Sequence, residues 1–208
     1  IYPSFNLIKD IKEFDSGKLS LKSNGFNKQF NTNTNEKIFI NDFTFNSNGK
    51  IRTSGLISNY QILLKNFNAE TKNSIKYKNK KENDLQSIIN YELKYPLQKI
   101  GKNYLNTFTP IISARYSPNK SKNKLDADRI INYDNVFSIN RIGFSDTIEG
   151  GQSLTLGSEY SIFDNFDNNK KLFSLNLATV FRDEKNDDLP INSTIGKIIG
   201  PITNERVA

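Results

Sequence analysis

Long segments in which polar and apolar residues alternate recur along the chain, and this feature constrains the fold more than any other. The clearest example is residues 87–97, where the odd-numbered positions are apolar or aromatic and most even-numbered ones are polar. Alternate residues of a β-strand point to opposite faces of a sheet. No segment shows the 3.6-residue periodicity of an amphipathic helix. The sequence therefore predicts an all-β protein.

The alternating segments predict about eight to ten strands. Most are near ten residues or longer, whereas strands of globular proteins average five or six. Tight turns alternate with longer connections such as 117–138, a mixture found in outer-membrane barrels. We therefore expect antiparallel up-and-down strands that form part of a large transmembrane β-barrel. The expected strands are 2–14, 17–24, 36–47, 51–67, 87–97, 108–117, 151–163 and 171–184, and the expected turns or loops include 31–36, 46–49, 76–84, 164–171 and 183–190.

The alternation alone does not say which face of the sheet meets water. In residues 151–163 the side chains of Leu154, Leu156, Tyr160 and Ile162 share one face, and mostly Ser, Thr, Gly and Glu share the other. A soluble β-sandwich turns its polar face outward, whereas a membrane barrel turns it inward. Both interpretations remain open at this point.

Composition excludes several classes of function. The 208 residues contain no Cys and no His, so disulfides, thiolate metal sites and His-dependent hydrolases are excluded within this chain. The net charge of +7 is uneven, with +8 in residues 1–104 and −1 in residues 105–208. No Lys or Arg cluster alternates with aromatic residues as in a nucleic-acid-binding module. The chain also lacks Met, even at position 1. We therefore expect a piece of a longer protein, truncated at both ends.

Two acidic pairs were considered as chemical sites. Asp146 and Glu149 have the residue types of a general acid and base, but no activated nucleophile accompanies them. Asp164 and Asp167 lack the spacing of a calcium-binding loop. We therefore expect no enzyme activity, no metal and no cofactor.

An ordered series of motifs lies mainly within residues 107–163. "FTPIISARYSPN" at 108–119 precedes the acidic stretch "LDADRIINYDNVF" at 125–137, and "NRIGFSDTIEGGQSLTLGSEY" follows at 140–160. A fourth motif, "LPINSTIG", occupies 189–196. In order and spacing this series resembles the LPS-assembly protein LptD, or organic-solvent-tolerance, family.

The chain departs from the family's pattern at a few positions. Thr109 stands in place of a Glu, Thr147 in place of an Arg and Thr194 in place of a Gly, and one further glycine is displaced to Gly143. The resemblance assigns the matching positions to structural loops and strands rather than to catalysis. These positions are Pro110, Pro118, Asp128, Asn135, Phe137, Arg141, Asp146, Glu149, Gly151, Gly157, Tyr160, Pro190 and Ser193.

The resemblance implies a function and a location. Residues 1–208 are expected to be a partial barrel domain in the outer membrane of a Gram-negative cell, where it inserts lipopolysaccharide into the outer leaflet. The implied partners are lipopolysaccharide, outer-membrane lipid, an LptE-like lipoprotein plug and a periplasmic bridge protein, with no nucleic acid. Leu154 and its neighbours on the same face would then meet lipid, and Arg141 would pair with Asp146 or Glu149. The alternatives are a generic outer-membrane porin or receptor barrel and a soluble β-sandwich binding module.

Overall fold

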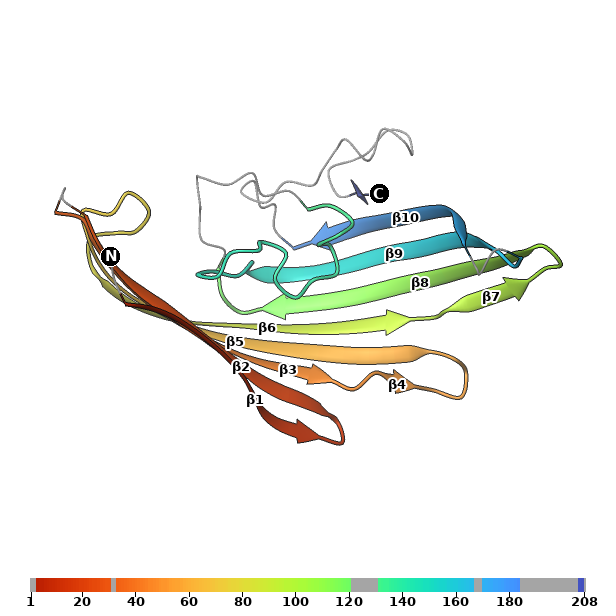
Figure 1. Cartoon of the computed structure of the whole chain (residues 1–208), viewed down its shortest axis with the longest axis horizontal. Coiled ribbons are helices and arrows are strands. Elements are labelled where there is room, and N and C mark those ends of the chain that lie inside the picture. Colours follow the sequence, from red (N-terminus) through yellow and green to blue (C-terminus); the bar gives the residue numbers. More distant parts are fainter. Residues whose placement is uncertain (1–2, 31–32, 121–130, 167–169, 184–205, 208) are drawn as a thin grey trace.

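The computed structural model describes residues 3–30, 33–120, 131–166, 170–183 and 206–207. These residues form one antiparallel sheet of eleven strands, drawn as a single curved layer in Figure 1. The strand order is β1-β2-β3-β5-β6-β8-β9-β10-β11, with β4 paired to β5 and β7 paired to β8. The strands are β1 Ser4–Phe14, β2 Gly17–Gln29, β3 Asn35–Ser47, β4 Lys50–Ile51, β5 Ile57–Lys72, β6 Lys81–Lys94, β7 Leu97–Ile100, β8 Tyr104–Ser117, β9 Gly151–Asp164, β10 Lys171–Arg182 and β11 Arg206–Val207.

The predicted all-β, antiparallel up-and-down architecture is confirmed. Consecutive long strands are neighbours in the sheet, with no crossover between them. The sheet is open, because β1 and β11 stand at the two ends of the strand order. No helix within the described ranges is long and apolar enough to cross a membrane.

Several predicted segment limits differ from the observed strands; β2, for example, continues to Gln29 rather than ending at residue 24. Three of the errors have a clear physical reason. The strand expected over 87–97 ends at Lys94 and resumes as β7, because Pro96 has no N–H to donate to the ladder. The continuous strand expected over 51–67 is broken between β4 and β5 by a turn that includes Gly55, whose φ of 84° favours glycine.

The third error concerns residues 76–84, which were expected to be a loop. Lys81–Asp84 belong to β6, where Lys81 pairs with Glu70 and Asp84 pairs with Phe67 of β5. Residues 81–84 are all charged or polar, so no apolar alternation marks this end of β6. Backbone hydrogen bonds between β5 and β6 continue the pairing to Lys81, and amino-acid composition does not reveal such bonds.

The two faces of the sheet differ in side-chain chemistry and in exposure. We call the face covered by residues 131–150 the inner face (Figure 1), and the opposite one the outer face. Side chains of the inner face are mostly polar or charged and many are buried, while large apolar side chains project from the outer face into the surroundings. The exposed outer-face residues include Phe39, Phe43, Ile62, Leu64, Ile89, Tyr91, Phe108, Ile112, Leu154, Leu156, Leu175 and Phe181.

Candidate functional site

The candidate site is the inner face of the sheet together with the segment that crosses it, residues 131–150, which we call the inner loop. Its first contact is an apolar cluster in which Ile131, Val136 and Ile142 of the loop pack on Ala178 and Val180 of β10. A fully buried Ile or Val stabilises a contact by roughly 1.5–3 kcal/mol. Burial on this scale is enough to hold the loop against the sheet.

A second apolar cluster holds the other part of the inner loop. Ile148 is almost completely buried against Leu63 of β5 and Ile88 of β6, with Ile139 packed beside them. The loop is therefore fixed at two places that lie on different strands.

An aromatic ring of the inner loop lies directly on a strand glycine. A Cβ atom at Gly157 of β9 would lie 2.5 Å from Cζ of Phe137 and 2.9 Å from the carbonyl oxygen of Leu177. Real Cβ atoms do not come this close to other heavy atoms, so only glycine leaves room for the ring. Phe137 also meets Tyr133 edge to face, with ring centroids 5.8 Å apart.

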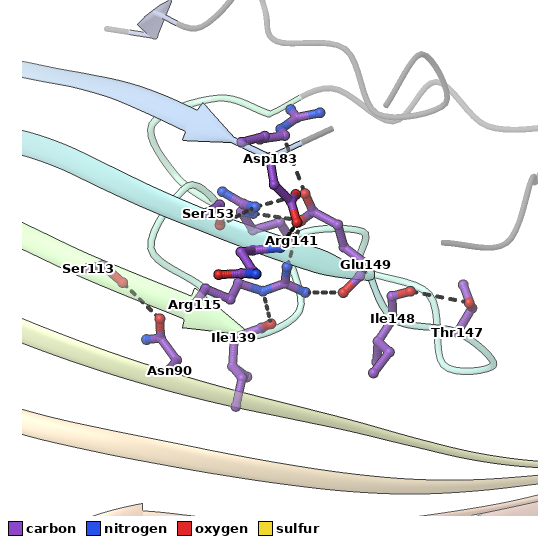
Figure 2. A network of polar contacts seen from close by, with 12 residues as sticks. Asn90, Ser113, Arg115, Ile139, Arg141, Thr147, Ile148, Glu149, Ser153 and Asp183 are labelled. Carbon is purple, nitrogen blue, oxygen red and sulfur yellow. Dashed lines mark hydrogen bonds and ion pairs between the residues drawn. The ribbon is translucent and has the colours of Figure 1, made fainter. Parts of the chain in front are cut away.

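A buried ionic cluster surrounds Glu149 at the end of the inner loop (Figure 2). Arg141 donates two hydrogen bonds to this carboxylate, from Nε to Oε2 and from Nη2 to Oε1, each 2.7 Å long. The two side chains are only 1% and 2% exposed. Arg141 had been expected to pair with Asp146 or Glu149, and its partner is Glu149. Arg141 Nη2 also donates to the hydroxyl oxygen of Ser153, 2.9 Å away.

Two strand arginines complete the cluster around Glu149. Nη1 of Arg115, from β8, lies 3.3 Å from Oε2, and Nε of Arg182, from β10, lies 3.7 Å from Oε1. Arg115 also donates from Nη2 to the Glu149 carbonyl at 2.7 Å and from Nε to the Ile139 carbonyl at 3.2 Å. Guanidinium forks suit such simultaneous contacts. The cluster therefore ties the loop to two strands.

A further contact joins the inner loop to the loop between β5 and β6. The buried carboxylate of Asp146 accepts a hydrogen bond of 2.8 Å from the Tyr77 hydroxyl and lies 3.2 Å from Lys76 Nζ. The Tyr77 ring stacks on Phe67 of β5 with centroids 5.9 Å apart. Burial, reinforced by the Asp146 charge, raises the pKa of Tyr77 above its usual value of 10.

A buried lysine of β5 also contacts the inner loop. Lys65 is 1% exposed, and its Nζ lies 2.5 Å from Oδ1 of Asp42 on β3. The same ammonium donates to the carbonyl oxygen of Ser145 at 2.7 Å. A buried ammonium requires such partners, because its desolvation is otherwise costly.

The structure distributes the predicted motif residues over three places. Those of the inner loop and its contacts come together: Asn135, Phe137, Arg141, Asp146, Glu149 and Gly157. Gly151 begins β9, Pro110 and Tyr160 lie on the outer face by strand register, and Pro118 follows β8. Asp128, Pro190 and Ser193 lie outside the described residues.

Several residues of the site were missed by the sequence analysis. Arg115, Arg182, Lys65 and Tyr77 are far in sequence from the loop residues that they contact. One signal was present for Arg115, because it is a charged residue on the polar face of an alternating strand. The other three have no local pattern that points to their partners.

No group of three or more His, Cys, Asp or Glu that is placed to hold a metal ion occurs in the part of the chain that the structure describes. The charged groups of the site instead fasten a loop inside a polar surface. Such an arrangement positions the backbone of the loop against the sheet.

Comparison with known families agrees with this organisation. A family model described as "LptD: LPS transport system D" matches residues 25–197, which extends from β2 through the inner loop and beyond β10. The chain belongs to the LptD family. The match begins well before the motif series, so the LptD resemblance is not confined to the region around the inner loop. No curated protein matches the chain.

Membership of the LptD family connects the chain with LPS transport in general. It also favours this family over the generic porin or receptor that the strand pattern left open. A soluble β-sandwich is disfavoured by the fold, because the described residues form one open sheet whose apolar face is uncovered.

Proposed function

We propose that the sheet is part of the wall of an outer-membrane barrel that delivers lipopolysaccharide to the outer leaflet. The observation that carries the proposal is the inverted burial of the sheet. Phe108 and Leu156 are exposed on the outer face, while Arg115, Arg141 and Glu149 are buried on the inner side. A bilayer would cover the exposed apolar side chains, and a polar lumen would accommodate the charged side.

The connections at the two ends of the strands support an orientation in the membrane. Residues 118–150 form the longest connection and lie at the same end of the sheet as 30–34 and 73–80. The connections at the other end, 15–16, 48–56, 95–103 and 165–170, are all much shorter than 118–150. In outer-membrane barrels the short turns are periplasmic and the longer loops are extracellular. The inner loop then enters the lumen from the extracellular side.

The transport step needs no covalent chemistry at this wall. A polar lumen stabilises the sugar part of the glycolipid, and the lipid outside the wall accommodates its acyl chains. In this proposal the protein is not an enzyme, and its partners are an LptE-like lipoprotein in the lumen and a periplasmic bridge protein that delivers the substrate.

Depletion of the full-length protein in its native cell tests this function. The proposal predicts that lipopolysaccharide disappears from the cell surface and accumulates in the periplasm or inner membrane. Normal surface lipopolysaccharide with altered uptake of small solutes would contradict it and would favour a porin or receptor.

A further inference from the structure

A recess of about 610 Å³ lies between the inner loop and the inner face of the sheet. Asn59, Gln61 and Asn90 line it from β5 and β6, Glu159 and Asn176 line it from β9 and β10, and Tyr133 lines it from the loop. Its size lies within the range of small-molecule sites in proteins. The recess does not include the ionic cluster around Glu149, so it is a separate feature of the lumen side.

The charges of the recess disfavour an anionic ligand. Its lining contains three carboxylates, from Glu92, Asp134 and Glu159, and one ammonium, from Lys94. Lys94 Nζ is already 3.0 Å from Oε1 of Glu92. A phosphate group placed here would meet a surplus of negative charge, which costs free energy in a partly buried site.

The polar groups of the recess suit a ligand that both donates and accepts hydrogen bonds. Oδ1 of Asn90 accepts a hydrogen bond of 2.8 Å from the Ser113 hydroxyl. The amide nitrogen of Asn90 donates no hydrogen bond to the described residues. The side chain of Asn176 makes no hydrogen bond within the described ranges. Amides supply N–H donors and carboxylates supply acceptors. Hydroxyl groups, which do both, complement this set.

The recess also has an apolar part and a fixed carboxylate. The buried side chain of Ile111 and the ring of Phe137 form part of the lining. The Tyr133 hydroxyl donates to Oε1 of Glu159 at 2.9 Å and so orients this carboxylate. A pyranose ring has the same combination, with C–H faces that pack on apolar side chains and a rim of hydroxyl groups.

We infer that this recess binds a neutral sugar unit of the transported glycolipid, and that the phosphorylated units bind elsewhere. The inference rests on the proposed function and adds to it the chemical class that this part of the lumen recognises. Selection arises because the amides bind hydroxyl groups while the carboxylates repel phosphate.

Binding of released oligosaccharide to the full-length protein in lipid nanodiscs tests this inference. The ligands are the oligosaccharide freed from the cell's own lipopolysaccharide, tested before and after enzymatic removal of its phosphates. We expect the dephosphorylated form to bind at least tenfold more tightly. We expect Asn176→Ala and Gln61→Ala each to weaken its binding about tenfold. The matched control is Ser174→Ala, on the same strand and face as Asn176 but outside the recess, which should leave binding unchanged.

Three outcomes would overturn the inference. They are absence of binding, tighter binding of the phosphorylated form, and equal binding by the Asn176→Ala, Gln61→Ala and Ser174→Ala variants. A heat-modifiability assay verifies that each variant is folded, and two independent recess variants guard against misfolding of one. If depletion abolishes surface lipopolysaccharide but the oligosaccharide does not bind, only this inference fails. If surface lipopolysaccharide persists on depletion, the proposed function fails as well.

Discussion

The ring of Phe137 occupies the space that any side chain at position 157 would need. Cζ of Phe137 lies 2.5 Å from the position of a Cβ atom on Gly157. These two residues are 20 positions apart, one in the inner loop and one in β9. Their contact explains why the strand tolerates a glycine, which is usually unfavourable there.

Substitution of Gly157 by Ala should therefore loosen the inner loop. Overpacking costs typically 1–3 kcal/mol, because the ring or the strand must move. We expect faster tryptic cleavage after Arg141, the one basic residue of the inner loop, measured by mass spectrometry of the full-length protein. Gly49→Ala is the control, since a Cβ there meets its nearest neighbour at an ordinary 3.7 Å. Equal cleavage rates in the two variants would show that the packing of the Phe137 ring does not depend on a glycine at position 157.

Replacement of Glu149 by Gln should destabilise the sheet strongly. Arg115 and Arg141 would lose the buried carboxylate that they contact, and breaking a buried pair costs about 3–5 kcal/mol. The control is Glu70→Gln, because Glu70 is half-exposed and lies 3.6 and 3.7 Å from Lys37 and Lys81. Exposed pairs contribute about 0–1 kcal/mol. Urea unfolding in lipid vesicles measures the stability of both variants. Similar unfolding midpoints would show that the ionic cluster around Glu149 does not stabilise the sheet.

Arg141→Gln should be less harmful than Glu149→Gln. The carboxylate of Glu149 would keep Arg115 and Arg182 as neighbours, whereas loss of the carboxylate affects all the guanidinium groups at once. The same urea experiment orders the two variants. An unchanged unfolding midpoint for Arg141→Gln would mean that its hydrogen bonds to Glu149 contribute nothing to stability.

Contact between the two loops at Tyr77 and Asp146 should weaken at alkaline pH. The pKa of Tyr77 is raised in the folded state, first by burial and then by the Asp146 charge, so folding favours the protonated phenol. The stabilisation is complete below pH 10 and is lost as the pH rises through the folded-state pKa. The melting temperature should fall more between pH 9 and pH 11 in the wild type than in Tyr77→Phe. Equal decreases in melting temperature in the two proteins would rule out ionisation of Tyr77 as the cause of the alkaline destabilisation.

Much of the sheet could be predicted from the sequence, because side-chain alternation is a local property. Spacing alone predicts that Phe39 and Phe43 share one face of their strand and that Leu154 and Leu156 share one face of theirs. The polar extension of β6 at Lys81–Asp84 could not be found this way, since its pairing with β5 is made by backbone groups.

The candidate site was predictable only where its contacts are close in sequence. Arg141 and Glu149 are eight residues apart, and their pairing was among the expected alternatives. Lys65 and Ser145 are 80 residues apart, and Tyr77 and Asp146 are 69 apart. These contacts depend on which strands are neighbours and on the path of the inner loop, and neither is a property of a short segment.

The proposed orientation of the sheet places its outer face in lipid and its inner face in water. Two adjacent pairs of residues test it, Ser174 with Leu175 on β10 and Gln61 with Ile62 on β5, because each pair places one side chain on each face. A small fluorescent amino acid is introduced at one position at a time in the full-length protein in liposomes. We predict that nitroxide-labelled lipids quench it at Leu175 and Ile62, and that aqueous iodide quenches it at Ser174 and Gln61. Equal quenching by iodide at all four positions would mean that the outer face does not lie in lipid.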